Sequence, residues 1–123
     1  MEIKNKIVLV TGSSIGIGKE TILEFAKEGA KVIITYNTHK KEAEKVFKEC
    51  KKLTECLLLN LNVTNLDSIK KCIEESIDKF GAIDILINNA GIFVEKNLLG
   101  NNYEEIKFEV DVNLLGLIKM TKV

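Results

Sequence analysis

One stretch near the start of the chain constrains the fold more than any other, because an apolar run there breaks abruptly into glycines. Residues 8–18 read Val-Leu-Val-Thr-Gly-Ser-Ser-Ile-Gly-Ile-Gly. The β-branched run at residues 7–10 is too short and too continuous for a surface helix, so it predicts a strand buried on both faces. Gly12, Gly16 and Gly18 permit positive φ angles or a close approach of backbone to a ligand. A helix starting here would direct free N–H groups at an anion, which predicts a phosphate cradle.

Length and charge exclude several classes of function. The 123 residues suffice for one domain, residues 1–123, and 46% hydrophobic residues with 29% charged ones are ordinary for a globular chain. Eighteen acidic residues balance 18 basic ones, all of them lysine, so no nucleic-acid or membrane partner is expected. No apolar run reaches the roughly 18 residues of a membrane-spanning helix, and the N-terminus lacks a signal pattern. A cytoplasmic location is therefore expected.

The three cysteines match no metal-binding or disulfide pattern. Cys50, Cys56 and Cys72 are odd in number, and their spacing fits no zinc site. Two of them fall on apolar helix positions. We expect reduced thiols on the core side of the elements and no metal ligands.

Strand-like and helix-like segments alternate along the chain. The apolar runs predict strands at residues 7–10, 31–36, 55–61 and 83–87. Between them, apolar residues recur at helical spacing and end at Gly29 and Gly81, with Thr38 and Asn65 as expected N-caps. A last helix is expected from about residue 102 to the end.

Such alternation predicts parallel strands joined by right-handed crossovers, with helices on both faces of the sheet. The usual doubly wound order places the four strands as 3-2-1-4. A ligand would then bind at the carboxyl ends of strands 1 and 4, where the order reverses. Gly12 and Asn89 both follow those ends, so we expect the two loops to meet there.

Three motifs resemble those of the short-chain dehydrogenase/reductase family. They are Thr-Gly-Ser-Ser-Ile-Gly-Ile-Gly at residues 11–18, Asp-Ile-Leu-Ile-Asn-Asn-Ala-Gly at residues 84–91 and Asp-Val-Asn-Leu-Leu-Gly at residues 111–116. The resemblance implies a Rossmann-like α/β fold that is truncated after its fourth βα unit. It also implies an NAD(P)-dependent oxidoreductase that transfers hydride between nicotinamide and a carbonyl or alcohol. The loops are most similar to reductases of 3-oxoacyl thioesters, although a small-alcohol or sugar dehydrogenase remains open.

The resemblance implies a set of cofactor-binding positions in the loops that follow the strands. They are Gly12, Ser13, Ser14, Ile15, Gly16, Ile17, Gly18, Tyr36, Asn37, Thr38, Asn62, Val63, Asn89, Ala90 and Gly91. It also gives Asn113 a supporting catalytic role, binding a water in a proton relay. Each has a plainer alternative: a glycine turn without a ligand for residues 11–18, an Asx turn or N-cap for Asn62, and a buried helix asparagine for Asn113.

The end of the second strand favours NADP over NAD. An acidic side chain about twenty residues past the glycines would bind the adenine ribose and repel a 2′-phosphate. The chain has Asn37 there instead, with His39, Lys40 and Lys41 supplying nearby positive charge. NADP is therefore the expected cofactor, with NAD as the alternative.

The catalytic serine and the Tyr-x-x-x-Lys pair of the family are expected beyond Asn113 and have no counterpart here. Tyr36 and Tyr103 each have a lysine four residues on, but both precede Asn113. We therefore expect the N-terminal part of an enzyme that acts on a small carbonyl or acyl thioester and forms a homo-oligomer through its final helix. The alternative is an inactive dinucleotide-binding or self-association module.

Overall fold

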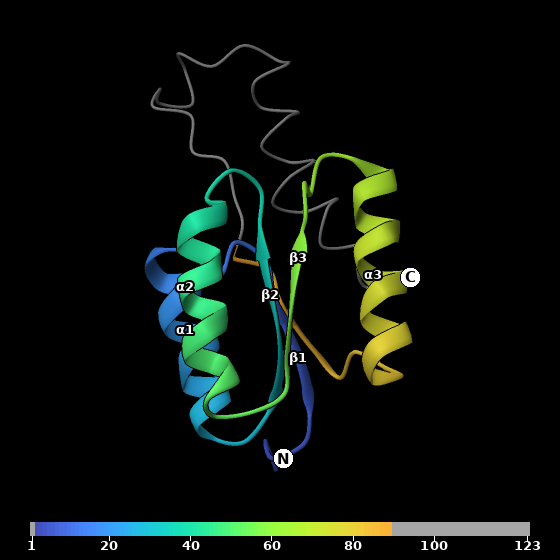
Figure 1. Cartoon of the computed structure of the whole chain (residues 1–123). Helices are drawn as coiled ribbons and strands as arrows, with labels where there is room; N and C mark the ends of the chain where they lie inside the picture. The colour runs from blue at the N-terminus through green and yellow to red at the C-terminus, as the bar shows by residue number, and fades with distance from the viewer. Residues whose placement is uncertain (1, 90–123) are drawn as a thin grey trace, which may run out of the picture.

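A computed structural model describes residues 2–89 of the chain. In these residues strands and helices alternate (Figure 1). The strands are β1 (Ile7–Val10), β2 (Lys31–Tyr36), β3 (Cys56–Asn60) and β4 (Ile85–Ile87). The helices are α1 (Gly16–Lys27), α2 (Lys40–Lys51) and α3 (Leu66–Phe80).

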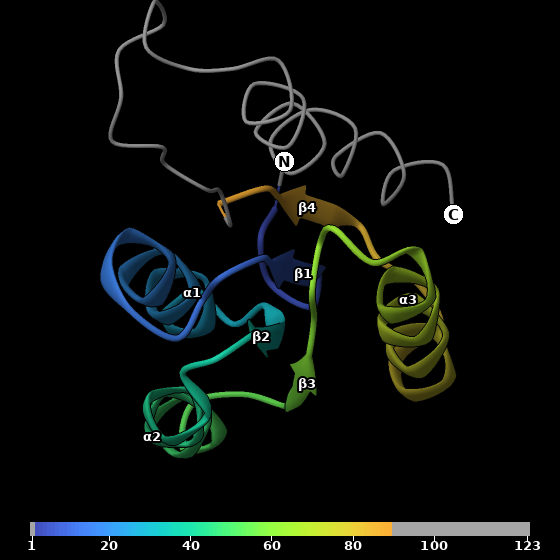
Figure 2. The same ribbon diagram turned by 90° about the horizontal axis from the view of Figure 1, so that it is seen from above.

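The four strands form one parallel sheet in the order β3-β2-β1-β4, as the sequence predicted. Val8 of β1 pairs with Val32 of β2 on one side and with Ile85 of β4 on the other. Figure 2 shows α1 and α2 on one face of the sheet and α3 on the opposite face. Because the strands are parallel and covered on both sides, the loops at their carboxyl ends all lie at one end of the molecule.

The alternation of side chains along each strand divides the core into two layers. Val8 and Val10 of β1 pack with Ile22 beneath α1 and α2. Leu9 of the same strand packs with Ile69 beneath α3. Burying each of these side chains stabilises the fold by about 1.5–3 kcal/mol. Continuous burial of β1 on both faces explains why its sequence is apolar without alternation.

Within residues 2–89 the predicted elements are present, with small shifts at their ends. The last helix, expected from about residue 102, lies outside the described residues. The third strand covers residues 56–60 where 55–61 was predicted, and the fourth covers 85–87 where 83–87 was predicted. Asp84, just before β4, already bonds to β1: its amide donates to the carbonyl of Ile7 at 2.9 Å, and its carboxylate accepts from the amide of Ile7 at 2.9 Å. Gly29 and Gly81 follow α1 and α3 with φ of 86° each, as expected for left-handed helix ends.

One N-cap prediction is confirmed and the other is wrong. Asn65 caps α3, because its side chain accepts a hydrogen bond from the amide of Ser68 at 3.0 Å. Thr38 does not cap α2, since the N-cap position belongs to His39. The hydroxyl of Thr38 instead bonds to Nδ1 of His39 at 3.2 Å, so it is directed to a side chain and not to the amides of the helix.

The three cysteines are buried and free, as expected. Burial raises the pKa of the Cys50 and Cys72 thiols to about 12, and it also raises the pKa of Cys56, against the opposing effect of Lys51 and Lys79. They are therefore protonated core side chains at neutral pH and poor nucleophiles.

The described helices and side chains also relate to membrane insertion and to metal binding. No helix within residues 2–89 is long and apolar enough to cross a membrane. In the same part of the chain, no group of three or more His, Cys, Asp or Glu side chains could hold a metal ion.

Candidate functional site

The loop between β1 and α1 turns sharply at two glycines. Gly12 has a φ of 65° and Gly16 a φ of 59°, values that favour glycine because a Cβ would be strained there. Just before the turn, the amide of Thr11 donates to the carbonyl of Ile87 at 3.0 Å, which continues the pairing of β1 with β4. The loop therefore leaves the sheet beside β4.

Two buried hydroxyls, which we call the hydroxyl clamp, fasten this loop to β2. The side chain of Ser13 accepts from the amide of Thr35 at 2.8 Å, and the amide of Ser13 donates to the carbonyl of Thr35 at 3.2 Å. The hydroxyl of Thr35 accepts from the amide of Gly12 at 3.0 Å and donates to the carbonyl of Val10 at 2.9 Å. Both side chains of the clamp are fully buried, so they fix the path of the loop.

The turn after β4 holds the same loop from the other side. The hydroxyl of Thr11 accepts from the amide of Asn89 at 2.9 Å and donates to Oδ1 of Asn88 at 3.1 Å. The side-chain amide of Asn89 donates to the carbonyl of Gly12 at 3.2 Å. The predicted meeting of the glycine loop with Asn89 is thus confirmed.

Gly18 is a glycine for a different reason from Gly12 and Gly16. A Cβ built on Gly18 would overlap the carbonyl oxygen of Gly12 and lie 2.5 Å from Nδ2 of Asn89. A Cβ on Gly16 would meet nothing within 4 Å. The absence of a side chain at Gly18 therefore lets α1 pack directly against the loop and against Asn89.

The first turn of α1 is left without a side-chain cap. Ile15 occupies the N-cap position, and the first turn contains no acidic residue. Its amides and the positive end of the helix dipole are thus not satisfied by the helix's own side chains, an arrangement that suits an anion. Ile15 and Ile17 are exposed beside it, at 45% and 78% of their surface. A ligand with both a phosphate and an apolar ring fits this combination.

A hollow of about 240 Å³ lies in front of the loop, between the ends of β2 and β4. Its lining is Gly12, Ser14, Ile15, Asn37, Thr38, His39 and Asn89. Every one of these except His39 belongs to the predicted cofactor-binding set. No carboxylate is present in this lining.

Other predicted positions lie near the hollow without lining it. Ser13 has its side chain in the hydroxyl clamp, so it faces β2. Tyr36 is half-buried against the core layer beneath α1 and α2. Gly16, Ile17 and Gly18 form the start of α1.

The Asn62–Val63 pair forms the local turn that was the plainer alternative. Oδ1 of Asn62 accepts from both the amide and the hydroxyl of Thr64, at 3.0 and 2.6 Å. The amide of Asn62 donates to the hydroxyl of Ser68 at 2.9 Å. Val63 is buried in the core layer beneath α3. The structure thus shows an Asx turn, and neither residue lines the hollow.

Ala90, Gly91 and Asn113 lie outside the described residues.

The positions that sequence reasoning missed are Thr11 and Thr35, which position the loop. The signal for Thr35 was available, since it is a hydroxyl residue inside an otherwise apolar strand and buried hydroxyls need hydrogen-bond partners.

A larger hollow of about 440 Å³ lies between β3 and α3. Its lining mixes Asp67, Lys71 and Glu75 and shares no residue with the glycine loop. Mixed charge without a convergent set of buried polar groups makes it a weaker candidate than the smaller hollow.

Comparisons with known proteins agree with this geometry. The family model described as short chain dehydrogenase matches residues 6–123. A 3-oxoacyl-[acyl-carrier-protein] reductase of Staphylococcus epidermidis is 40% identical over 114 residues, which are 92% of this chain and 47% of that protein. One from Thermotoga maritima is 38% identical over 123 residues, covering 99% of this chain and 50% of that protein. The chain spans about half the length of the curated relatives it matches.

Solved structures show the same fold. A short chain dehydrogenase from Burkholderia cenocepacia in complex with NADP superposes with a TM-score of 0.90 at 28% identity, over 99% of this chain and 50% of that one. A 3-ketoacyl-(acyl-carrier-protein) reductase from Brucella melitensis complexed with NADH has a TM-score of 0.85 at 34% identity, over 98% of this chain and 49% of that one. The glycine loop, the parallel sheet in the order β3-β2-β1-β4 and these matches together show that the chain belongs to the short-chain dehydrogenase/reductase family.

Proposed function

We propose that this chain binds NAD(P) as the cofactor-binding part of an oxidoreductase. The observation that supports this most directly is the convergence of Gly12, Gly18 and Asn89 around the uncapped first turn of α1. A side chain at Gly18 would close this approach, and the dinucleotide pyrophosphate is the anion that a cradle of this shape suits.

The lining of the hollow supports NADP as the preferred dinucleotide, with NAD as the alternative. The adenosine ribose of a dinucleotide held at α1 would reach the end of β2, where Asn37 and Thr38 line the hollow. No carboxylate in this lining would repel a 2′-phosphate. Asn37 is itself held in place, because its carbonyl accepts from the side-chain amide of Asn60 at 3.4 Å.

When bound, the nicotinamide would supply or accept the hydride. The residues of this chain bind and orient the dinucleotide: α1 faces the pyrophosphate, and the clamp of Ser13 and Thr35 fixes the loop. Asn89 and the exposed Ile17 lie where the ribose and nicotinamide would follow. Ala90, Gly91 and the relay asparagine Asn113 complete the proposed set.

The proposed substrate is a carbonyl compound, with 3-oxoacyl thioesters favoured. Support comes from the relatives, several of which are named 3-oxoacyl-[acyl-carrier-protein] reductases. Assembly into a homo-oligomer through the final helix is part of the same proposal, and light scattering on the full chain tests it.

A fluorescence titration tests dinucleotide binding. Adding the full chain to NADPH and to NADH should shift the nicotinamide emission to the blue, with tighter binding of NADPH. The Gly18→Val variant should lose the signal, and Lys70→Gln, an exposed change on α3, should keep it. Equal signals from Gly18→Val and the wild type would overturn the proposal. Binding without turnover of any carbonyl substrate would instead indicate a dinucleotide-binding module.

A further inference from the structure

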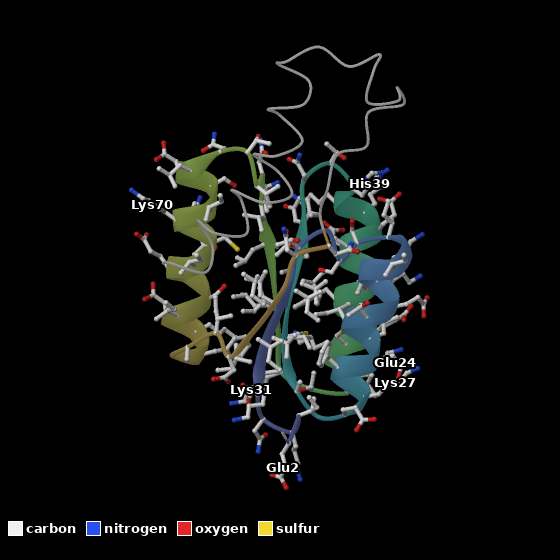
Figure 3. The ribbon with its side chains drawn as sticks, turned by 180° about the vertical axis from the view of Figure 1, so that it is seen from behind. Glu2, Glu24, Lys27, Lys31, His39 and Lys70 are labelled. Carbon is white, nitrogen blue, oxygen red and sulfur yellow. The ribbon has the colours of Figure 1, made fainter. Side chains whose placement is uncertain are left out.

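Gly12 is bonded on two sides to residues that lie far from it in the sequence. Its amide donates to the hydroxyl of Thr35 at 3.0 Å, and its carbonyl accepts from the side-chain amide of Asn89 at 3.2 Å. Thr35 is the next-to-last residue of β2, and Figure 3 shows this strand running from the end of the molecule marked by Lys31 to the end marked by His39. One glycine therefore joins the carboxyl end of β2 to the turn after β4.

Thr35 binds both of the peptide groups that flank Gly12. The peptide before Gly12 is held through the hydroxyl of Thr35, as just described. The peptide after Gly12 is held through the backbone of Thr35, whose carbonyl accepts from the amide of Ser13 at 3.2 Å. The hydroxyl of Ser13 in turn accepts from the amide of Thr35 at 2.8 Å. Because both flanking peptides are fixed, the backbone of Gly12 is fixed as well, with its φ at 65°.

The peptide between Gly12 and Ser13 has its two polar groups bonded in opposite directions. The N–H and the C=O of a trans peptide point away from each other. Here the N–H faces Thr35 of β2, so the C=O faces away from β2 and meets the side chain of Asn89. A rotation of this peptide would remove the acceptor from Asn89. The orientation of the Gly12 carbonyl is thus determined from the β2 side.

The side chain of Asn89 connects this peptide to the hollow. It lines the hollow, and its Nδ2 would lie 2.5 Å from a Cβ built on Gly18. The Gly12 carbonyl therefore holds the amide group of Asn89 in a space that α1 leaves open. Thr35 has no exposed surface and does not line the hollow, so it influences a ligand only through other residues.

We propose that Thr35 is a positioning residue for Asn89: through the peptide after Gly12, it holds the side-chain amide of Asn89 against the hollow. The inference rests on the proposed dinucleotide function and deepens it, because the hollow is the proposed binding site. A buried residue of β2 then controls how tightly the ribose and nicotinamide bind beside β4. The adenosine half meets the end of β2 directly and does not depend on this link.

The first experiment observes the Gly12 carbonyl without any ligand. Gly12 is the only glycine that a serine follows, so isotope labels in glycine carbonyls and serine amides give one NMR signal for this peptide. Thr35→Val and Asn89→Ala should both move the carbonyl shift upfield, because the bond between Gly12 and Asn89 is weakened or lost in each. Thr35→Ser keeps the hydroxyl and should leave the signal in place.

The matched control for this experiment is Ser76→Ala. It removes a fully buried hydroxyl that donates to the carbonyl of Cys72 at 2.7 Å within α3. The chemical change resembles that of Thr35→Val, but it lies outside the glycine loop. The Gly12 signal should therefore stay where it is in the wild type.

The second experiment measures dissociation constants of NADPH for Thr35→Val, Asn89→Ala and the double variant. Thr35→Val alone should weaken binding about fivefold, the factor that corresponds to one hydrogen bond. In the Asn89→Ala background it should weaken binding less than about twofold, because the residue through which Thr35 acts has been removed. Adenosine 2′,5′-bisphosphate lacks the nicotinamide half, and Thr35→Val should change its affinity less than about twofold.

A second variant covers a failure of Thr35→Val to fold. Ser13→Ala removes only the acceptor for the amide of Thr35 and keeps the other two bonds between Thr35 and the loop. It then takes the place of Thr35→Val in the binding measurements, with the same dependence on Asn89 expected.

The outcomes distinguish this inference from the proposed function. A Gly12 signal that Thr35→Val leaves unmoved would contradict the role of Thr35. Equal losses of NADPH affinity with and without the side chain of Asn89 would also contradict it, since independent residues add their effects. If the wild type does not bind NADPH, the proposed function fails, whereas the Gly12 signal still tests the link between Thr35 and Asn89.

Discussion

Two loops at the same end of the sheet are built in opposite ways. The β1–α1 loop is held by bonds between residues 22 to 78 positions apart, from Thr35 on one side and from Asn88 and Asn89 on the other. In the β3–α3 loop, Leu61 still bonds to β2 through its amide and the carbonyl of Tyr36, but the side-chain bonds that follow join residues two to six positions apart, within residues 62–68.

The difference decides which helix can offer its amides to a ligand. At α3, Asn65 already accepts from the amide of Ser68, so the local turn uses part of the donor set itself. At α1, the hydroxyl of Ser13 bonds to β2, the hydroxyl of Thr11 bonds to the turn after β4, and Ile15 leaves the first turn without a side-chain cap. A cap from its own loop stabilises α3 by using one of its first amides. Because the polar side chains before α1 bond elsewhere, the first amides of α1 remain available to an anion.

The largest expected effect comes from closing the approach between α1 and the first loop. Gly18→Ala should lower the free energy of unfolding by about 2 kcal/mol, because the new Cβ meets the carbonyl of Gly12 and the side chain of Asn89. Gly16→Ala is the matched control, with open space around its Cβ but a positive φ, and should cost about 1 kcal/mol. Urea unfolding measures both, and equal losses would show that the contact with Asn89 does not constrain α1.

Removing one hydroxyl of the clamp tests whether the bonds from β2 hold the β1–α1 loop. Thr35→Val keeps the shape but deletes the acceptor for Gly12 and the donor to Val10, and should cost about 2 kcal/mol. Thr21→Val removes a hydroxyl bonded to Ile17 on the exposed side of α1, and should change stability by less than about 0.5 kcal/mol. NADPH affinity should fall in the first variant only. If the two variants unfold at the same urea concentration, the clamp does not hold the loop.

Removing the local cap tests the other loop. Asn65→Ala should lower stability by about 1 kcal/mol, since α3 loses the acceptor for the amide of Ser68. NADPH affinity should be unchanged, because this loop shares no residue with the lining of the hollow. Asn65→Asp, another good N-cap, should restore most of the stability. A loss of NADPH affinity in Asn65→Ala would break the distinction between the two loops.

The smallest effect at neutral pH comes from the buried thiols. Cys50 and Cys72 have pKa values raised from 9.0 to about 12, so the folded state keeps protons that the unfolded state releases. Their contribution to stability is complete below about pH 9 and is lost as pH rises from there toward 12. None of the side chains that form the hydrogen bonds of the two loops is titratable. The loss of unfolding free energy caused by Thr35→Val should therefore be equal at pH 7 and at about pH 10.

Replacing one of the cysteines provides the control for these measurements of stability against pH. Cys72→Ala should show a shallower loss of stability above about pH 9 than the wild type, because one raised pKa has been removed. An identical slope in Cys72→Ala would mean that the thiol does not contribute to the alkaline loss.

The fold and much of the site could be predicted from the sequence, because they follow from local patterns. Continuous apolar strands such as β1, the stripe on α3 and the glycines that end helices predicted the alternating elements, and the usual doubly wound arrangement then predicted the order β3-β2-β1-β4. Parallel pairing at a switch point also predicted that Gly12 lies beside Asn89, which their hydrogen bond confirms.

The features that could not be predicted are the hydrogen-bond partners of short polar side chains. Ser13 in the β1–α1 loop bonds to Thr35 of β2, and spacing along the chain contains no signal for that pairing. Thr38 is a good N-cap by type, yet it bonds to His39 instead. Hydroxyl side chains have several partners of similar energy within reach, so tertiary contacts decide among them.

The bonds that join Thr11 and Gly12 to Asn88 and Asn89 also determine when, during synthesis of the chain, the glycine loop gains its support. The glycine loop is translated first, but the side-chain and backbone amides of Asn89 that hold it on the β4 side follow 77 and 78 residues later. At about 5–20 residues per second, the ribosome needs roughly 4–15 seconds to supply them. During that interval the nascent chain has its glycine loop without the support of Asn88 and Asn89, so the last of the four strands to be made completes the first turn of the fold.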